Sequence, residues 1–206
     1  SKKMEERIEA KDYDTIESKF VSEYGFIGPC CRKSTEEYMD GASMDREGNI
    51  WHMHSNVFEK GTVNAAIEKN YLDHPETLSL DDYILYGGMV HGLMYGYSLE
   101  AIRFKEHCGG GLFWMYNDAW GEVGWTIIDY YLRRKIPFYA VKRALAHQKF
   151  TMRAADGQLV LQGANDYPED LEVSGKLGYV SFDGKVKELR DIVLKVCLLY
   201  TSPSPR

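Results

Sequence analysis

The sequence lacks the features that mark several large classes of protein. No apolar run approaches the roughly 20 residues that a membrane helix needs, and the start has no basic segment leading into an apolar stretch, as a secretory signal would. Only 6 of the 206 residues are proline and 19 are glycine, with 44% hydrophobic residues, which excludes a collagen-like, disordered or coiled-coil chain. We therefore expect a soluble globular chain.

Basic residues are also scarce. The 25 Lys and Arg against 31 Asp and Glu give a formal net charge of -6, so charge gives no reason to expect nucleic acid or a membrane as a partner. The four cysteines, of which Cys30 and Cys31 are adjacent, do not indicate a disulfide framework in so long a chain. The sequence leaves localisation and oligomeric state open. The adjacent cysteines weakly favour a reducing, cytoplasmic compartment.

The two ends of the sequence differ from the rest. Residues 197–206 break abruptly from the globular pattern and resemble the translation of a sequencing-library adapter, so they are left out of the fold prediction. The sequence also starts without Met. We therefore expect an interior piece of a longer protein that continues beyond Val196.

The first part of the chain predicts one strand followed by helices. Residues 19–26 are rich in β-branched and aromatic residues and are stopped by Gly25, Gly28 and Pro29, which predicts a short buried strand. Residues 34–37, Ser-Thr-Glu-Glu, have the form of a capping box and predict a helix start. A Gly- and Asn-bearing loop over 40–60 and a helix over 62–71 follow.

A longer helix and a second strand come next. Ser-Leu-Asp-Asp at 79–82 is a second capping-box-like start, and apolar or small residues then recur on one helical face: Leu80, Tyr83, Ile84, Gly87, His91, Met94, Tyr95, Ser98 and Ile102. Three glycines lead into residues 112–116, an apolar run typical of a strand buried on both faces. Pro137 fits the first turn of a helix to about Leu145. This order predicts parallel α/β structure.

The pattern changes near His147. Four strands are predicted, separated by turns at Asp-Gly and Tyr-Pro, over residues 150–153, 159–163, 171–182 and 185–196. Apolar and polar residues alternate over 171–179, which predicts one buried and one exposed face. These features indicate an antiparallel β-sandwich with fewer strands than the seven that such a sandwich usually has.

Two residues stand at the ends of the predicted parallel strands. Functional groups of parallel α/β barrels lie at the carboxyl ends of strands, where Glu23 and Trp114 are expected. A carboxylate can attack an anomeric carbon, and an indole ring can stack on a sugar. Composition alone favours structural roles instead, with Glu23 paired to an Arg or Lys and Trp114 packed in the core.

Longer motifs shift this interpretation towards sugar chemistry. Residues 110–120, Gly-Gly-Leu-Phe-Trp-Met-Tyr-Asn-Asp-Ala-Trp, with Trp-Thr-Ile-Ile-Asp-Tyr-Tyr at 125–131, resemble the last barrel strand of glycoside hydrolase family 2, most closely its β-mannosidase branch. Ser-Glu-Tyr-Gly at 22–25 resembles the nucleophile strand of that branch. The resemblance implies the last strand–helix units of a (β/α)8 TIM barrel over residues 1–146 and an incomplete immunoglobulin-like sandwich over 147–196.

The resemblance also implies an activity. It implies a retaining exo-acting β-mannosidase that removes terminal nonreducing β-D-mannose from small or oligomeric mannosides, with no cofactor and no metal. Glu23 would be the catalytic nucleophile, Trp114 the floor of the nonreducing-end subsite, and Tyr24 a neighbour of the nucleophile. The loop after the nucleophile strand would form the rim, or else be a loop anchored by its Trp, and it carries Trp51, His52 and His54.

The sequence departs from the family pattern in two places. The acid/base of this branch is a Glu that follows an Asn, and no Asn-Glu occurs in the sequence. Retaining hydrolysis needs two carboxyls about 5 to 5.5 Å apart, so we expect this chain alone to be inactive. Residues 27–31 differ from the usual Gln-Ser-Phe-Pro continuation. Because two strand–helix units cannot close a barrel, we also expect exposed apolar strand faces and poor solubility.

Three alternatives stay open. β-Galactosidases, β-glucuronidases and exo-glucosaminidases share this barrel. A noncatalytic carbohydrate-binding relative would keep the aromatic floor without the chemistry. A zinc site would draw on Cys30-Cys31, His52-x-His54 and His107-Cys108, but neither Cys-x-x-Cys nor His-x-x-x-His spacing occurs.

Overall fold

The computed structural model describes residues 7–155, 157–197 and 200–203. The chain divides into two compact units, one of Ser1–Arg103 with His107–Leu145, the other of Phe104–Glu106 with Ala146–Arg206. Each unit is described by itself below.

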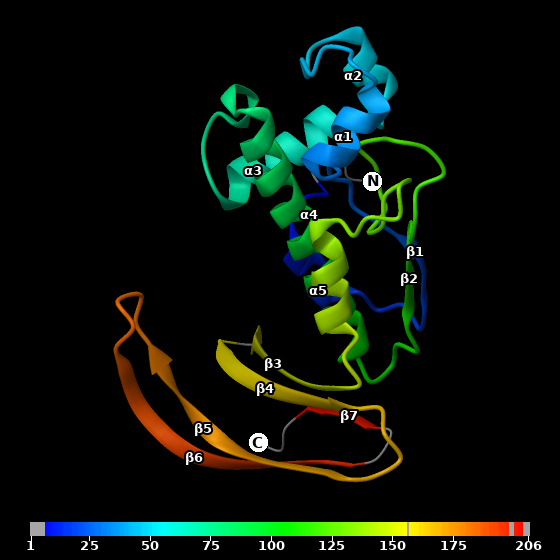
Figure 1. The fold of residues 1–206 in the computed structure, drawn as a ribbon. Helices are drawn as coiled ribbons and strands as arrows, with labels where there is room; N and C mark the ends of the chain where they lie inside the picture. Colours follow the sequence, from blue (N-terminus) through cyan, green and yellow to red (C-terminus); the bar gives the residue numbers. More distant parts are fainter. Residues whose placement is uncertain (1–6, 156, 198–199, 204–206) are drawn as a thin grey trace. The chain divides into compact units, whose positions relative to one another are not determined.

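A pair of parallel strands forms the sheet of the first unit. β1 (Val21–Tyr24) pairs with β2 (Gly111–Phe113), with Val21 opposite Gly111 and Tyr24 opposite Phe113, and Figure 1 shows the two side by side. The predicted parallel pairing is therefore confirmed. Both strands are shorter than predicted, so Trp114 lies just beyond the end of β2.

Helices make up most of the rest of the first unit. In chain order they are η2 (Ala10–Thr15, 3-10), α1 (Arg32–Met39), α2 (Asn49–Met53), η3 (Lys60–Asn64, π-helical), α3 (Ala65–Asn70), η4 (Pro75–Thr77, 3-10), α4 (Leu80–Arg103) and α5 (Ile136–Ala144). α4 and α5 run side by side in Figure 1. A Cβ at Gly88 of α4 would lie 2.5 Å from Ile136 Cδ1, so a side chain there would force the Ile136 side chain of α5 to move.

The longest helix, α4, follows its sequence prediction closely. The Ser79 hydroxyl accepts a hydrogen bond from the Asp82 backbone N–H at 3.2 Å, which satisfies one amide group left open at the helix start, and donates one to the Asp82 carboxylate at 2.6 Å. The predicted face is buried at Tyr83, His91 and Tyr95. Tyr83 and Tyr95 belong to the two apolar clusters that form the core of the first unit.

Three helix predictions need correction. α1 begins at Arg32 and not at the capping box, because the Ser34 hydroxyl is buried and donates to the Asp129 carboxylate at 2.5 Å. The predicted loop over 40–60 contains α2. The predicted helix over 62–71 is a π-helical turn followed by α3, which ends at Asn70.

The parallel strands expose much of their apolar surface. Phe20, Leu112 and Tyr116 are half or more exposed, at 50%, 60% and 58%, so both segments expose apolar side chains, as predicted. The residues that follow β1 are buried instead, with Phe26 at 2% and Ile27 at 0% exposure. The core therefore lies beneath the carboxyl end of β1.

The second unit consists of two small antiparallel sheets. β3 (Gln148–Ala155), β4 (Gln158–Asn165) and β7 (Tyr200–Pro203) form one sheet in the order β3-β4-β7. β5 (Leu171–Val180) and β6 (Val186–Val196) form a hairpin with Leu171 opposite Val196. All four predicted strands are confirmed as antiparallel partners, and β7 falls in the segment left out of the fold prediction.

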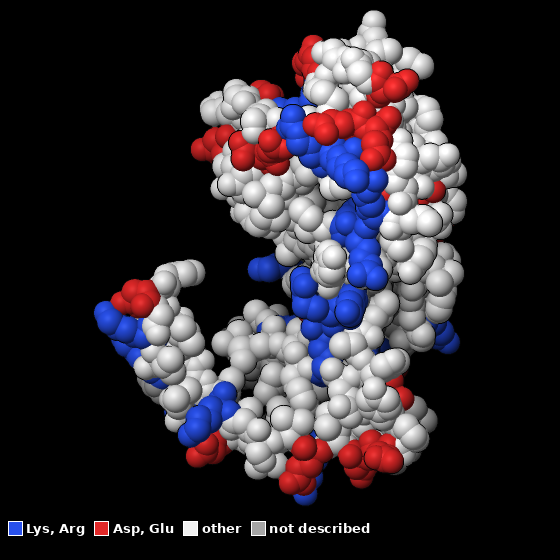
Figure 2. All heavy atoms as spheres, in the orientation of Figure 1, with Lys and Arg blue, Asp and Glu red and all other residues white. Residues whose placement is uncertain are grey.

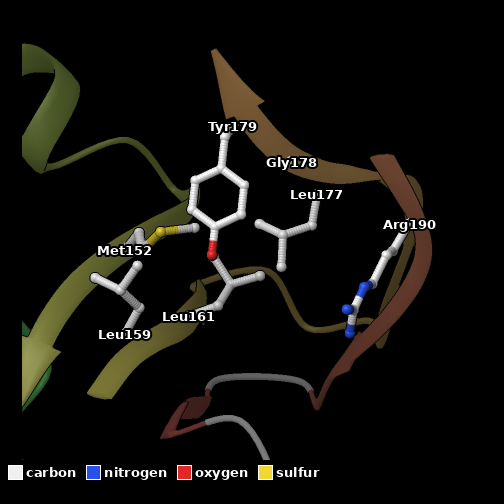
Figure 3. A pocket seen from close by; sticks show the side chains of 7 residues that line it. All are labelled: Met152, Leu159, Leu161, Leu177, Gly178, Tyr179 and Arg190. Carbon is white, nitrogen blue, oxygen red and sulfur yellow. The ribbon is translucent and has the colours of Figure 1, made fainter. Parts of the chain in front are cut away.

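The predicted burial of one face of β5 is wrong for most of its length. Leu171 and Val173 are half-buried, but Leu177 and Tyr179 are 37% and 62% exposed. The reason is that this face borders an open cavity of about 280 Å³ rather than a packed layer. Figure 3 shows the side chains that surround the cavity, which is lined by Met152, Leu159, Leu161, Leu177, Gly178, Tyr179 and Arg190.

Two further features of the helices are their hydropathy and the position of the basic side chains. No helix in the described part of the chain is long and apolar enough to cross a membrane. Figure 2 shows Lys and Arg side chains gathered over α5, whose last turn carries Lys142 and Arg143. Cations at a helix C-terminus are favoured by the helix dipole.

Candidate active site

Glu23 and Trp114 are brought to the same edge of the sheet by the parallel strands. Glu23 is the third of the four residues of β1, and the Trp114 backbone N–H, directly after β2, donates to the Tyr24 carbonyl oxygen at 2.6 Å. Both residues border one cavity of about 430 Å³. The residues that line it are Arg7, Tyr13, Glu23, Tyr24, Gly25, Phe26, Asn56, Phe58, Thr62, Trp114 and Trp125.

The Glu23 carboxylate is exposed at this cavity. Among residues 7–155, 157–197 and 200–203, no side chain forms an ion pair or a hydrogen bond with it. The structural alternative from the sequence, a carboxylate paired with an Arg or Lys, is not what these residues show. Trp114 is likewise not packed in the core, since it is 50% exposed. A carboxylate and an indole ring therefore share an open cavity.

Tyr24 borders the cavity with an anchored ring. Its ring packs edge to face against Tyr13, with 5.3 Å between ring centroids, and against Tyr95 at 6.2 Å. Burial raises the pKa of the Tyr24 hydroxyl well above its usual value, so the phenol stays neutral at physiological pH. Tyr24 thus contributes a fixed neutral wall beside Glu23.

Tyr95 of α4 ties the two aromatic segments of the cavity together. Its hydroxyl lies 2.5 Å from the Trp114 carbonyl oxygen and 2.7 Å from the Trp125 carbonyl oxygen. Because a phenol has one proton, the two carbonyls share it. This contact fixes the backbone below both tryptophans from the buried side of the unit.

Close packing explains why the last residue of the Ser-Glu-Tyr-Gly motif, Gly25, is a glycine. A Cβ at this position would lie 2.5 Å from the Trp114 carbonyl oxygen and 2.9 Å from Trp125 Cε3. Real side chains do not approach backbone that closely, so any other residue would push the two strand ends apart. The glycine lets the strand that carries Glu23 lie directly against the segment that carries Trp114.

The predicted rim residues lie away from the cavity lining. Trp51 is in the core at 1% exposure, where its ring meets Tyr83 edge to face at 6.2 Å. His52 is exposed on α2, and His54 stacks against Tyr38 and Trp120. An indole ring on a helix that faces a core is buried by the hydrophobic effect, which explains the position of Trp51.

Other residues of the same loop reach the cavity, and sequence reasoning assigned them no role. Asn56 and Phe58 line it because the backbone pairs with the segment after β2, through a hydrogen bond of 3.1 Å from Asn56 N–H to the Val123 carbonyl. Trp125 was part of a recognised motif but received no role. Its position five residues after Trp120 gave no signal of which ring would face the cavity.

Buried charges hold the segment that follows Trp114. Asp118 and Lys135 are 4% and 2% exposed, and the Lys135 ammonium donates to the Gly124 carbonyl at 3.3 Å. Burial raises the pKa of the Asp118 carboxyl, and the nearby Lys135 charge acts in the opposite direction. Lys135 therefore holds the backbone of this segment at Gly124. No group of His, Cys, Asp and Glu in the described ranges is arranged to hold a metal ion.

Sequence comparisons relate the chain to glycoside hydrolases. No family model matches it. It is 30% identical over 141 residues to β-mannosidase B of Aspergillus terreus, an overlap of 65% of this chain and 16% of that protein. It is 28% identical over 143 residues to β-mannosidase B of Emericella nidulans, with the same coverage. The chain thus spans about a sixth of the length of these relatives.

Comparison with solved structures relates the fold to the same class. The β-D-mannosidase of Dictyoglomus thermophilum superposes with a TM-score of 0.86 at 23% identity, over 98% of this chain and 25% of that one. An exo-chitosanase of Amycolatopsis orientalis in complex with PNP-β-D-glucosamine gives 0.70 at 17% identity, over 95% and 25%. The relatives are glycoside hydrolases. The chain itself resembles the β-mannosidase branch of family 2, as its motifs predicted.

Proposed function

We propose that this chain is the nucleophile-bearing part of a retaining exo-β-mannosidase. The observation that carries the proposal is the shared cavity, which places an unpaired carboxylate, Glu23, and a half-exposed indole, Trp114, at the ends of adjacent parallel strands. Residues 1–146 would be the end of a TIM barrel and 147–196 the start of an immunoglobulin-like sandwich, with 197–206 an adapter remnant. The β-mannosidase relatives support the assignment.

The proposed reaction has two displacements. A Glu23 carboxylate oxygen forms a bond to the anomeric carbon of the terminal mannose while the glycosidic C–O bond breaks and the leaving oxygen takes a proton from an acid. Water then gives a proton back to the same acid/base group and attacks the same carbon, which breaks the bond to Glu23 and releases mannose and the free carboxylate. Trp114 stacks on the apolar face of the sugar and holds its anomeric carbon towards Glu23.

The second carboxyl of this mechanism is proposed to lie in sequence upstream of Ser1. No Asn-Glu occurs in the chain, and Glu23 is the carboxylate that lines the cavity among its described residues. One carboxyl cannot perform both general acid/base and nucleophilic steps. The 206-residue chain should therefore release no nitrophenol from an aryl β-mannoside, whereas the protein completed with its upstream coding sequence, called here the completed enzyme, should.

Replacement of Glu23 in the completed enzyme tests the nucleophile. Glu23→Gln should lower kcat/KM on an aryl β-mannoside by roughly 10⁴-fold or more, as loss of a catalytic nucleophile does. Glu23→Ala supplied with azide should yield α-mannosyl azide, because the small anion enters from the face that the carboxylate occupied. Glu17→Gln, an exposed carboxylate six residues away, is the matched control. Retention of activity within tenfold in Glu23→Gln would overturn the assignment.

Glucosamine is the rival sugar, because one structural neighbour is an exo-chitosanase with bound PNP-β-D-glucosamine. The assignment to mannose rests on the β-mannosidase relatives and on the Asn117-Asp118-x-Trp120 pattern. Rates of the completed enzyme on aryl β-mannoside, β-galactoside, β-glucuronide and β-glucosaminide decide between these sugars. A higher kcat/KM on any of the last three would replace mannose.

A further inference from the structure

A stack of three aromatic rings lies outside the cavity lining. The His54 ring is parallel to Trp120, with 4.4 Å between centroids and 16° between planes, and to Tyr38, with 4.9 Å and 22°. The three rings come from α1, the C-terminal end of α2 and the segment after β2. Tyr38, His54 and Trp120 are called the Trp120 platform below.

The platform is held in place by specific contacts. His54 Nδ1 donates a hydrogen bond of 2.7 Å to the Gly121 carbonyl oxygen, which can only accept. A Cβ at Gly121 would overlap the Tyr38 ring, so the backbone beside Trp120 lies directly on that ring. His54 thus fills one face of the indole with a ring whose orientation is fixed.

The outer ring of the platform stays open. Trp120 is 46% exposed although His54 covers one of its faces. Single exposed apolar residues are ordinary, but a rigid indole with a supporting ring behind it is pre-organised to stack a flat apolar surface. Glu122 stands beside it. Burial and the Asp118 charge raise the pKa of the Glu122 carboxyl, and a hydrogen bond with the Trp120 side chain opposes that rise.

The platform is next to the cavity in the chain and in space. His54 is two residues from Asn56, which lines the cavity, so their Cα atoms are at most about 7 Å apart. The Val123 backbone forms hydrogen bonds with both residues. Its N–H donates to the His54 carbonyl oxygen at 2.8 Å, and its carbonyl oxygen accepts from the Asn56 N–H at 3.1 Å. The Trp120 platform and the Glu23–Trp114 cavity therefore share one rigid connection.

From this arrangement we infer that the Trp120 platform binds the sugar unit on the leaving-group side of the scissile bond. The inference rests on the proposed function, in which the terminal mannose fills the cavity and the next unit of an oligosaccharide must extend out of it. The apolar face of that unit would stack on the open face of Trp120. The Glu122 carboxylate would accept hydrogen bonds from its hydroxyls.

Substrates with and without a leaving-group sugar test the inference in the completed enzyme. Trp120→Ala should lower kcat/KM on β-1,4-mannobiose by roughly 3- to 10-fold, the value of one aromatic stacking contact, and leave it unchanged on β-mannosyl fluoride. Tyr139→Ala removes an aromatic ring that is exposed to a similar degree, at 48%, and should change neither substrate. His54→Ala keeps the indole but removes its support, and should show a smaller loss confined to mannobiose.

The outcomes separate this inference from the proposed function. Equal losses on both substrates, or no loss on mannobiose in Trp120→Ala and His54→Ala, would overturn the role of the platform. Failure of the proposed function would show differently. In that case the unsubstituted completed enzyme would leave β-mannosyl fluoride intact, or Glu23→Gln would still hydrolyse it.

Discussion

Apolar side chains meet in a closed core in the first unit, whereas in the second unit many of them stay exposed on two small sheets. The first unit buries Trp51, Tyr83 and Tyr95 at 1% exposure or less. Among the described residues of the second unit, the buried apolar side chains are Phe104, Ala164 and Val196. Both units have regular hydrogen-bonded elements, so backbone pairing by itself does not produce a core.

The difference has a physical origin in layering. In the first unit α4 carries apolar residues that face both the strands and α5, which gives each a partner. In the second unit β5 and β6 pair with each other, and one face of that hairpin borders an open cavity. A sheet needs a second layer on its apolar face to gain the free energy of burial.

Thiol reactivity should show the largest contrast between the units. Cys30 is 1% exposed, and burial raises its pKa to about 12, whereas Cys197 is exposed. At pH 8 the Cys30 thiol should react with iodoacetamide roughly 10³-fold more slowly than Cys197, because it must first be uncovered by unfolding. Mass spectrometry of labelled peptides measures both rates. Comparable rates would mean that the first unit has no stable core.

The Cys30 thiol should also make the free energy of unfolding depend on pH. The native Cys30 keeps its proton up to about pH 12, whereas the unfolded thiol ionises from its ordinary value of 9.0. The native state therefore binds more protons in this interval, and the free energy of unfolding should fall as the pH rises from about 9 to about 12. Cys30→Ala should remove this component of the pH dependence, and Cys31→Ala should keep it.

Truncation of one aliphatic residue in each unit should give the next largest contrast. Ile67→Ala removes a side chain that is fully buried and should lower the free energy of unfolding by about 2 to 5 kcal/mol. Leu189→Ala removes the same number of carbon atoms from a side chain that is 54% exposed and should cost under about 0.5 kcal/mol. Urea titration measures the first by tryptophan fluorescence, since all four tryptophans lie in the first unit, and the second by circular dichroism. Equal costs would contradict the contrast in packing.

Removal of a hydroxyl should give the smallest contrast. Tyr95→Phe leaves the Trp114 and Trp125 carbonyls without their shared donor and should cost about 1 to 3 kcal/mol. Tyr179→Phe, at a side chain that is 62% exposed, should cost close to nothing. Urea titrations followed by tryptophan fluorescence for Tyr95→Phe and by circular dichroism for Tyr179→Phe measure the two changes in the free energy of unfolding. A neutral Tyr95→Phe would show that water satisfies both carbonyls.

Secondary structure could be predicted from the sequence where local patterns and long-range packing agree. The start of α4 at Ser79, its buried face and the parallel pairing of β1 with β2 all follow from spacing and capping chemistry. The start of α1 could not be predicted in this way, because the Ser34 hydroxyl donates a hydrogen bond to the carboxylate of Asp129, which lies 95 residues further along the chain. No local pattern records such a partner.

The candidate site was predictable in part for a related reason. Glu23 and Trp114 could be placed because the ends of neighbouring parallel strands meet at one edge. The residues around them depend on how the loop after α2 runs, and that path is set by backbone bonds to Val123. Trp51, expected at the rim, therefore lies in the core, and Asn56, for which nothing was expected, lines the cavity. A predicted loop gave no direction for either side chain.

The close approach at Gly25 has a consequence for how this protein can change over evolutionary time. Any side chain at position 25 displaces the backbone of Trp114, so a tolerated substitution there requires a compensating change in the segment after β2. Glycine should therefore be retained at position 25 in homologues that keep the path of this segment. The strand that carries Glu23 and the segment that carries Trp114 are therefore inherited as one unit.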